Sequence, residues 1–390
     1  MNSPRPFSRA VTASLAFALA LAGCGGGNND SPAVPKFNAV VSFGDSLSDV
    51  GAYAPATSLA GNGTAPYFGG KFTTNGTAAP IWVESLATSL GLAVTPAEVG
   101  FNGRSVKCPA AADPAQAHTC TAYGQGGARI SDPQGIGHKA DGSGALTVPV
   151  VTQIANHLAR FGGFKSSDLV LVYAGNNDVF VDFAIYGFVV DETQTAVAAG
   201  TLSAADAAAQ VAAAKKAVED DVTAAAGNLA AAVKTQIIAK GASYVAVMTV
   251  SDISDTPFGR EFPAELRPEL TNLSVIFNAA LQKGLADAPV RIIDTFTLSK
   301  EVFANPAKYG FVNNTTPACD IAKITAITGG TVSDGSSLFC NGTPGAPYNG
   351  LVAGADTLTW QFADNVHPTT GGHRAITAAF TAQLKSFGWI

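Results

Sequence analysis

Short runs of β-branched and apolar residues alternate with helical patterns along this chain, and this alternation restricts its fold more than any other feature. The runs expected to form strands are Ala39–Phe43, Asp168–Ala174, Tyr244–Val250 and Val290–Asp294; the helical patterns are Pro80–Leu90, Val148–Arg160, Ser203–Lys240, Pro263–Leu285 and Thr370–Phe387. Strands that alternate with helices favour a parallel sheet, because each parallel crossover needs a connection that a helix supplies. We therefore predict an α/β protein whose sheet is covered by helices.

Residues suited to acyl transfer follow two of the predicted strands. Ser46 lies in Gly44-Asp45-Ser46-Leu47, directly after the first run, and Asn177 lies in Gly175-Asn176-Asn177-Asp178, directly after the second. The carboxyl ends of parallel strands lie at one edge of a sheet, where substrates bind in open α/β folds, so the two side chains are expected to meet there. A serine hydroxyl is a weak nucleophile until a base takes its proton, and the rest of the chain must supply that base.

A candidate base lies near the far end of the chain, in Asp364-Asn365-Val366-His367-Pro368. Asp364 stands three residues before His367 and reaches its far ring nitrogen if the segment forms a turn, which would orient the imidazole. His373 is a rival base six residues later. A glycine-rich loop, Gly124–Arg129, could present a backbone N–H to a developing oxyanion; it lacks the Lys-Ser/Thr ending of a phosphate-binding loop.

The blocks GDSL, GGA, GNND and DNVH, in this order, resemble the GDSL family of SGNH hydrolases. The segment 70–76 followed by Trp82, and the segment 305–311 leading to Cys319, are similar to the family's bacterial lipase and esterase branch. The resemblance runs from about Phe37 to the C-terminus. It implies a three-layer α/β/α sandwich with a flavodoxin-like parallel sheet, and hydrolysis of carboxylic esters without a cofactor or metal ion.

The resemblance also implies roles for individual residues. The nucleophile would be Ser46, and the base would be His367, oriented by Asp364. The oxyanion donors would be the N–H of Ser46, the N–H of Gly127 and the side-chain amide of Asn177. Family members often carry an asparagine shortly before the double glycine, whereas here the segment 122–125 reads Ala-Tyr-Gly-Gln, so both glycines of the pair stay open as the donor.

The N-terminus resembles a bacterial lipoprotein signal. Positive charges precede an apolar stretch too short to span a bilayer comfortably, and it closes with Leu21-Ala22-Gly23-Cys24, similar to a lipobox. The resemblance implies a signal peptide over residues 1–23, acylation of Cys24, a flexible tether over 24–36 and a hydrolase domain over 37–390. Gly25 after the cysteine implies transport to the outer membrane of the cell envelope, facing the periplasm or the exterior. The alternative is an ordinary secretory signal.

Four further cysteines allow two disulfides and three pairings: Cys108, Cys120, Cys319 and Cys340. We predict the local pairing of Cys108 with Cys120 and of Cys319 with Cys340, since each would close one loop-rich segment, 91–147 or 305–357. Zinc binding is the competing interpretation, but the spacings lack the short ligand pairs of such sites. No histidine forms an i, i+4 pair with another ligand type, so we expect no metal site.

Composition restricts the partners. The formal charge of −6 becomes −8 when the two arginines of the signal peptide, Arg5 and Arg9, are removed (−6 − 2), which argues against nucleic acid. The expected partners are a small-molecule or lipid ester and, through the lipid on Cys24, a membrane. The same site could serve a phospholipase, an acyltransferase or a polyester hydrolase. A rival of a different class is a non-catalytic envelope lipoprotein that binds lipid or glycan.

An apolar, aromatic segment, 180–190, follows the GNND block directly. Two interpretations are open: it lines a pocket for an acyl chain or forms a lid, or it is a helix face packed on the sheet.

Overall fold

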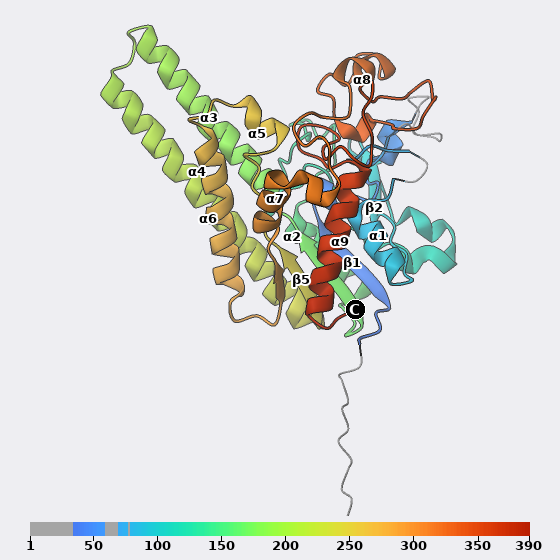
Figure 1. The fold of residues 1–390 in the computed structure, drawn as a ribbon. Helices are drawn as coiled ribbons and strands as arrows, with labels where there is room; N and C mark the ends of the chain where they lie inside the picture. The colour runs from blue at the N-terminus through green and yellow to red at the C-terminus, as the bar shows by residue number, and fades with distance from the viewer. Residues whose placement is uncertain (1–33, 59–68, 77–78) are drawn as a thin grey trace, which may run out of the picture. The chain divides into compact units, whose positions relative to one another are not determined.

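The computed structural model describes residues 34–58, 69–76 and 79–390 of the chain (Figure 1). One compact unit extends over Pro35–Ile390. The expected signal peptide, Cys24 and the tether up to residue 33 lie outside the described residues. Among the helices of the described part, none is both long and apolar enough to cross a membrane.

A parallel sheet of four strands forms the centre of this unit. In spatial order the strands are β1 (Ala39–Gly44), β4 (Asp168–Tyr173), β5 (Tyr244–Met248) and β6 (Arg291–Ile293). They coincide with the four expected runs to within a few residues, so the prediction of a parallel α/β sheet is confirmed. β4 is buried along its whole length, as expected for a parallel strand covered on both faces.

An extended segment beside β1 replaces a further full strand. The Ser42 N–H donates to the Thr121 carbonyl (2.9 Å), and the Tyr123 N–H donates to the Ser42 carbonyl (2.7 Å), which makes one parallel bridge with Ala122. This contact places the glycine-rich loop that follows at the carboxyl end of β1.

Helices cover both faces of the sheet. One face packs against α2 (Val150–Phe161), α3 (Asn176–Ala198), α4 (Ala204–Ala232) and α6 (Arg267–Leu285); the other packs against α1 (Trp82–Ser89) and α9 (Thr370–Ser386). Val170 and Val172 of β4 enter the first core, whereas Leu169 and Leu171 enter the second, as the two-residue period of a strand requires. The result is the three-layer α/β/α sandwich that the family resemblance implies.

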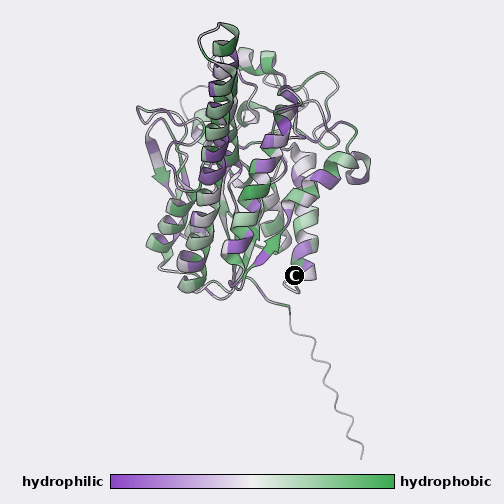
Figure 2. Cartoon of the chain, turned by 90° about the vertical axis from the view of Figure 1, so that its left-hand side faces the viewer, coloured by the Kyte–Doolittle hydropathy of each residue, from purple (hydrophilic) through white to green (hydrophobic). Residues whose placement is uncertain are grey.

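A long helical hairpin extends from the first of these layers. α3 and α4 lie side by side and run away from the sheet to a shared tip (Figure 1), and α4 also packs along α6. The helices of this layer, which face the viewer in Figure 2, carry both hydrophilic and hydrophobic residues. The expected helix over Ser203–Lys240 is α4 continued by a π-helical turn, Val233–Ile237, and a 3-10 turn, Ile238–Lys240.

The aromatic segment after the GNND block is part of α3. Phe183 and Val190 are buried in the core beneath this helix, so the interpretation as a packed helix face holds for them. Ile185 and Phe188 point away from that core and are 49% and 66% exposed.

The two loop-rich segments contain more regular structure than expected. Residues 91–147 include an antiparallel hairpin of β2 (Glu98–Phe101) and β3 (Arg104–Lys107), and residues 305–357 include α8 (Ile321–Ile327). The remaining short helices are α5 (Pro257–Glu261), α7 (Thr295–Ala304) and the 3-10 helices η1 (Ser46–Ser48), η2 (Ala54–Thr57), η3 (Pro109–Ala112), η4 (Pro114–Thr119), η7 (Pro306–Tyr309) and η8 (Ser337–Phe339). Disulfides join Cys108 to Cys120 and Cys319 to Cys340, which is the predicted local pairing.

Candidate active site

Ser46 lies in a tight turn at the carboxyl end of β1. Gly44 ends the strand against β4, where a Cβ atom would lie 2.2 Å from the Tyr173 carbonyl oxygen, so only glycine fits. Asp45 then caps η1 by accepting a hydrogen bond from the Leu47 N–H (3.1 Å). Ser46 is the first residue of η1, and its own N–H has no acceptor among the described residues.

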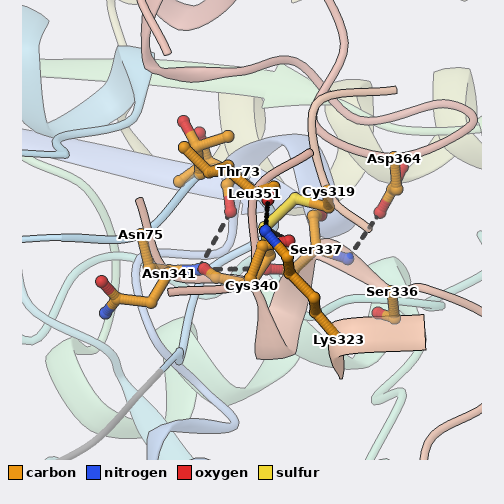
Figure 3. The surroundings of a disulfide bond; sticks show 12 residues. Thr73, Asn75, Cys319, Lys323, Ser336, Ser337, Cys340, Asn341, Leu351 and Asp364 are labelled. Atoms are coloured by element: carbon orange, nitrogen blue, oxygen red, sulfur yellow. Dashed lines mark hydrogen bonds between the residues drawn. A yellow bond between two sulfur atoms is a disulfide. The ribbon is translucent and has the colours of Figure 1, made fainter. Parts of the chain in front are cut away.

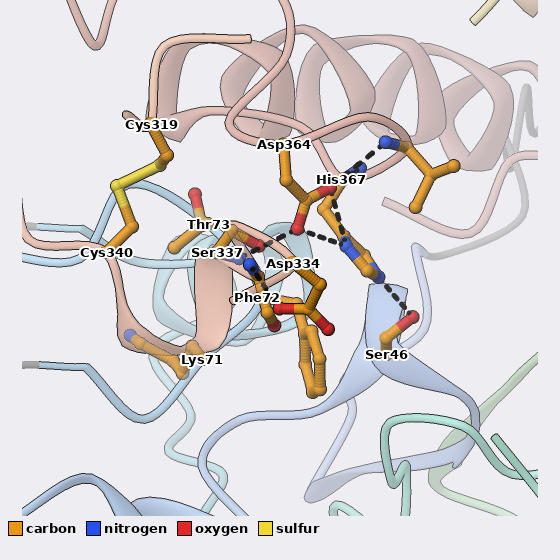
Figure 4. Close-up of polar contacts among 12 residues, drawn as sticks. Ser46, Lys71, Phe72, Thr73, Cys319, Asp334, Ser337, Cys340, Asp364 and His367 are labelled. Atoms are coloured by element: carbon orange, nitrogen blue, oxygen red, sulfur yellow. Dashed lines mark hydrogen bonds and ion pairs between the residues drawn. A yellow bond between two sulfur atoms is a disulfide. The ribbon is translucent and has the colours of Figure 1, made fainter. Parts of the chain in front are cut away.

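His367 and Asp364 complete a chain of hydrogen bonds from Ser46 (Figure 4). The Nε2 atom of His367 lies 2.8 Å from the Ser46 Oγ, and its Nδ1 atom lies 2.9 and 2.8 Å from the two carboxylate oxygens of Asp364. The turn between them is closed by the Ala363 N–H, which donates to the His367 carbonyl (2.7 Å). The candidate nucleophile, base and acid that the sequence predicts are thus in contact in the fold.

The rival base, His373, lies apart from Ser46. It is fully buried in α9, where its Nε2 atom lies 3.4 Å from the Phe72 carbonyl oxygen. Burial lowers the pKa of His373 to about 3. His367, and not His373, is the histidine that contacts the serine hydroxyl.

Asp364 is held as a carboxylate. Burial alone would raise its pKa, but the charge of His367 and hydrogen bonds from His367, Ser337 and Val366 outweigh burial and hold the pKa well below its usual value. The Ser337 N–H donates to Oδ2 (2.8 Å), and the N–H groups of Val366 and His367 donate to Oδ1 (3.0 and 2.7 Å). An ionised Asp364 can stabilise a positive charge on His367.

Asn177 and the glycine-rich loop contact each other beside this turn. The side-chain amide of Asn177, in the first turn of α3, donates one N–H to the Ala128 carbonyl (2.9 Å), and its second N–H has no partner in the described part of the chain. The Gly126 N–H is already bonded to Asp49 Oδ2 (3.0 Å), whereas the Gly127 N–H makes no hydrogen bond to a described residue. Of the two glycines, Gly127 is thus the one with an available donor.

The backbone of Gly127 explains why the loop needs glycine there. Its φ angle is +79°, and a Cβ atom would lie 2.0 Å from the Ile136 carbonyl oxygen. Any residue larger than glycine at position 127 would therefore displace the backbone of the loop.

Buried aspartates hold this edge of the sheet together, and the sequence analysis missed them. Asp45 accepts from the Asn176 side chain (3.2 Å); Asp49 accepts from three backbone N–H groups; Asp178 accepts from the Ile130 N–H and pairs with Arg129. Burial raises the pKa of each of the three to about 6. The signal was present, because each aspartate stands within three residues of Ser46 or Asn177.

Phe72 is a further residue that the sequence analysis did not single out. Its ring lies over the His367 ring, with centroids 4.8 Å apart. A Cβ atom on Gly126 would lie 2.2 Å from two carbons of the same ring, so the phenylalanine fills the space between the glycine loop and the histidine.

Across residues 34–58, 69–76 and 79–390, no group of three or more His, Cys, Asp or Glu side chains could hold a metal ion.

The chain is similar to several known proteins. The family model described as "GDSL-like Lipase/Acylhydrolase" matches residues 40–380. Two proteins named "Esterase EstA", from Pseudomonas aeruginosa and Pseudomonas putida, are each 35% identical over 150 residues. That match covers 38% of this chain and 20% of each relative, so the chain matches a fifth of the relatives' length. An extracellular lipase from Streptomyces rimosus aligns over 88% of this chain and 98% of its own, with 15% identity and a TM-score of 0.36.

Proposed function

The chain belongs to the GDSL-like lipase/acylhydrolase family, and from this premise we propose that it is a serine hydrolase that cleaves carboxylic esters through an acyl-enzyme intermediate. The observation that carries the proposal is the hydrogen bond of 2.8 Å between the Ser46 Oγ and the Nε2 atom of His367. A base at this distance can take the hydroxyl proton as the oxygen attacks.

The reaction proceeds in two halves. The Ser46 Oγ forms a bond to the ester carbonyl carbon while its proton passes to Nε2 of His367, and Asp364 on the other ring nitrogen stabilises the imidazolium. The bond between the carbonyl carbon and the alcohol oxygen then breaks, and the alcohol leaves with the proton from Nε2. In the second half, His367 takes a proton from water, whose oxygen forms a bond to the acyl carbon. The bond between the acyl carbon and the Ser46 Oγ then breaks, Nε2 of His367 returns the proton to Oγ, and the carboxylic acid leaves.

Three N–H groups are proposed to stabilise the negative oxygen of the tetrahedral intermediate. They are the backbone N–H groups of Ser46 and Gly127 and the second N–H of the Asn177 amide. None of the three donates a hydrogen bond to another described residue, so each is available to a substrate oxygen. Donors fixed before the reaction stabilise the transition state without reorganisation.

Hydrolysis of p-nitrophenyl esters of increasing acyl length by the full chain, purified in detergent, tests the proposal. We expect Ser46→Ala to abolish turnover, and Ser89→Ala, at the surface of α1, to leave turnover unchanged. The chain-length optimum separates an esterase from a lipase. A folded wild-type protein that cleaves no ester, or a Ser46→Ala variant with wild-type activity, would overturn the proposal.

We also propose that the chain is a lipid-anchored protein of the cell envelope, supported by the sequence around Cys24 alone. The full chain expressed in a Gram-negative host is then expected in the membrane fraction, and Cys24→Ala in the soluble fraction or retained with its signal uncleaved. A Cys24→Ala variant that fractionates and is processed like the wild type would contradict the anchor.

A further inference from the structure

The segment closed by the Cys319–Cys340 disulfide supplies a hydrogen bond to the proposed catalytic acid. The donor is the backbone N–H of Ser337, which lies 2.8 Å from Asp364 Oδ2 (Figure 3). The other N–H donors to this carboxylate in the described chain come from its own turn, at Val366 and His367. Ser337 is therefore the donor that fixes Asp364 from outside the turn.

Both ends of the disulfide are tied to the surroundings of Asp364. On one side, the Cys319 N–H donates to the carbonyl of Ala363, the residue directly before Asp364 (2.8 Å). On the other side, the Cys340 N–H donates to the Ser337 carbonyl (3.1 Å), and the Asn75 amide contacts the carbonyl oxygens of both Ser337 and Cys340 (3.0 and 3.1 Å). The disulfide thus links the segment that precedes the acid to the segment that hydrogen-bonds its side chain.

Besides these hydrogen bonds and those through Gly350, few apolar contacts hold the two segments together. The hydrophobic cluster around the disulfide is small; its buried members are Ala318, Cys319, Ile324, Cys340, Leu351 and Ala363. Two of the six are the disulfide cysteines themselves, and the regular structure between them is limited to α8 and η8. A small cluster without the crosslink has few contacts with which to keep a loop of this length in one position.

We infer that Ser337 is a positioning residue for the proposed catalytic acid and that the Cys319–Cys340 disulfide serves turnover by holding its N–H against Asp364. The inference rests on the proposed function. Asp364 must present an oxygen to Nδ1 of His367 while Nε2 faces Ser46, and the Ser337 N–H sets the rotation of the carboxylate. Loss of this donor misaligns the base and lowers kcat, while the binding of the ester, and so KM, is little affected.

Two substitutions at position 337 distinguish the role of the backbone N–H from the role of the side chain. Ser337 is the first residue of η8, where proline is tolerated, and Ser336 before it has the extended backbone (φ −50°, ψ 127°) that proline favours in its neighbour. Ser337→Pro therefore deletes the donor without breaking the helix, and its ring carbon Cδ takes the place of the hydrogen that faces Asp364 Oδ2, so the carboxylate must also move away. Ser337→Ala keeps the N–H donor and removes only the hydroxyl of this buried side chain.

We expect Ser337→Pro to lower kcat by about tenfold or more with KM within about twofold, and Ser337→Ala to keep wild-type values. Wild-type kcat in a folded Ser337→Pro protein overturns the inference, while a wild-type enzyme that cleaves no ester overturns the proposed function instead. A fall in kcat shared by Ser337→Ala also overturns the inference, because the hydroxyl and not the N–H would then be responsible.

A pair of disulfide variants keeps the inference testable if Ser337→Pro does not fold. The Cys319→Ser/Cys340→Ser variant is expected to lose kcat at least tenfold at a temperature where circular dichroism shows it folded. The matched control is Cys108→Ser/Cys120→Ser, whose loop keeps hydrogen bonds from Thr95 to Thr119 and from Ser42 to Thr121. Equal kcat in the two double variants, or a Cys319→Ser/Cys340→Ser protein with wild-type kcat, overturns the inference.

Discussion

The side-chain amide of Asn177 donates a hydrogen bond of 2.9 Å to the carbonyl oxygen of Ala128. One amide N–H thereby joins the first turn of α3 to the glycine-rich loop and leaves the second N–H of the same group without a partner in the described chain. The contact orients the amide before any substrate arrives, which is the condition under which a hydrogen-bond donor stabilises a transition state most strongly.

Asn177→Ala is expected to lower kcat by a factor of about a hundred or more, because an oxyanion donor is worth about 3 kcal/mol in comparable enzymes. The Ala128 carbonyl also loses its buried partner, which costs about 1–3 kcal/mol of stability. Steady-state kinetics and urea unfolding of the same preparation measure both effects. Asn156→Ala, on α2, is the control, and near-normal turnover by Asn177→Ala would remove this residue from the mechanism.

Gly126→Ala is expected to displace the proposed base, His367, indirectly through the ring of Phe72. The new Cβ atom would lie 2.2 Å from two carbons of the Phe72 ring, which in turn lies over His367. Overpacking typically costs about 1–3 kcal/mol, so we expect kcat/KM to fall by about tenfold if the strain reaches His367.

The control for this substitution is Gly187→Ala, within α3, where an added Cβ atom meets no heavy atom within 4 Å. It is expected to keep full activity and to raise stability by about 0.5–1 kcal/mol, since alanine has the higher helix propensity. Equal activity of the two variants would show that the Phe72 ring yields without disturbing His367.

Asp182→Asn is expected to stabilise the protein at neutral and alkaline pH. Burial, only partly offset by Arg129, raises the pKa of Asp182 from 3.8 to about 7, so the folded protein holds this proton more tightly than the unfolded chain. The contribution of this bound proton to the free energy of unfolding is fully present below pH 4 and is lost as the pH rises through about 7. Asparagine does not titrate, so the variant keeps its free energy of unfolding where the wild type loses part of it. The difference between variant and wild type should therefore grow from pH 4 to pH 8.

Urea unfolding at the two pH values measures this difference. Asp132→Asn is the control, because this half-exposed carboxylate pairs with the same Arg129 at the surface and such pairs contribute at most about 1 kcal/mol. A stability difference for Asp182→Asn that does not change between pH 4 and pH 8 would contradict the prediction.

Removal of either disulfide is expected to lower the free energy of unfolding by a similar amount. The crosslinked residues are 12 and 21 positions apart, and loop-closure entropy predicts about 3 kcal/mol for each. Urea unfolding of the two double-serine variants tests this. A loss below about 1 kcal/mol in either variant would show that its loop stays ordered in the unfolded chain or is held by other contacts.

The main strands could be predicted from the sequence because a buried parallel strand is a continuous apolar run, as in β4. The hairpin of β2 and β3 could not, since all four residues of β3 are exposed and show no alternation of apolar and polar residues. α3 was left undecided for a related reason, because apolar residues lie on all sides of its first half, with Phe183 buried and Phe188 exposed.

The contacts of Ser46, Asp364 and His367 could be expected from the sequence. Asp364 and His367 are only three residues apart, and Ser46 directly follows a predicted strand. The partners that support them come from distant segments, and no sequence pattern links such segments. Phe72 reaches His367, and Ser337 reaches Asp364, through loops whose path depends on packing and on a disulfide. The separate roles of Gly126 and Gly127 became distinguishable only through the hydrogen bond from Gly126 to Asp49.

The hydrogen bond between Ser46 and His367 joins residues 321 positions apart. During synthesis the ribosome therefore releases Ser46, the proposed nucleophile, long before His367, the proposed base. His367 lies just before α9, which packs against α1, where Phe380 lies edge-on to Trp82 (ring centroids 4.9 Å apart). On the proposed function, ester hydrolysis therefore requires both ends of the domain, and a chain that stops before His367 is expected to be inactive.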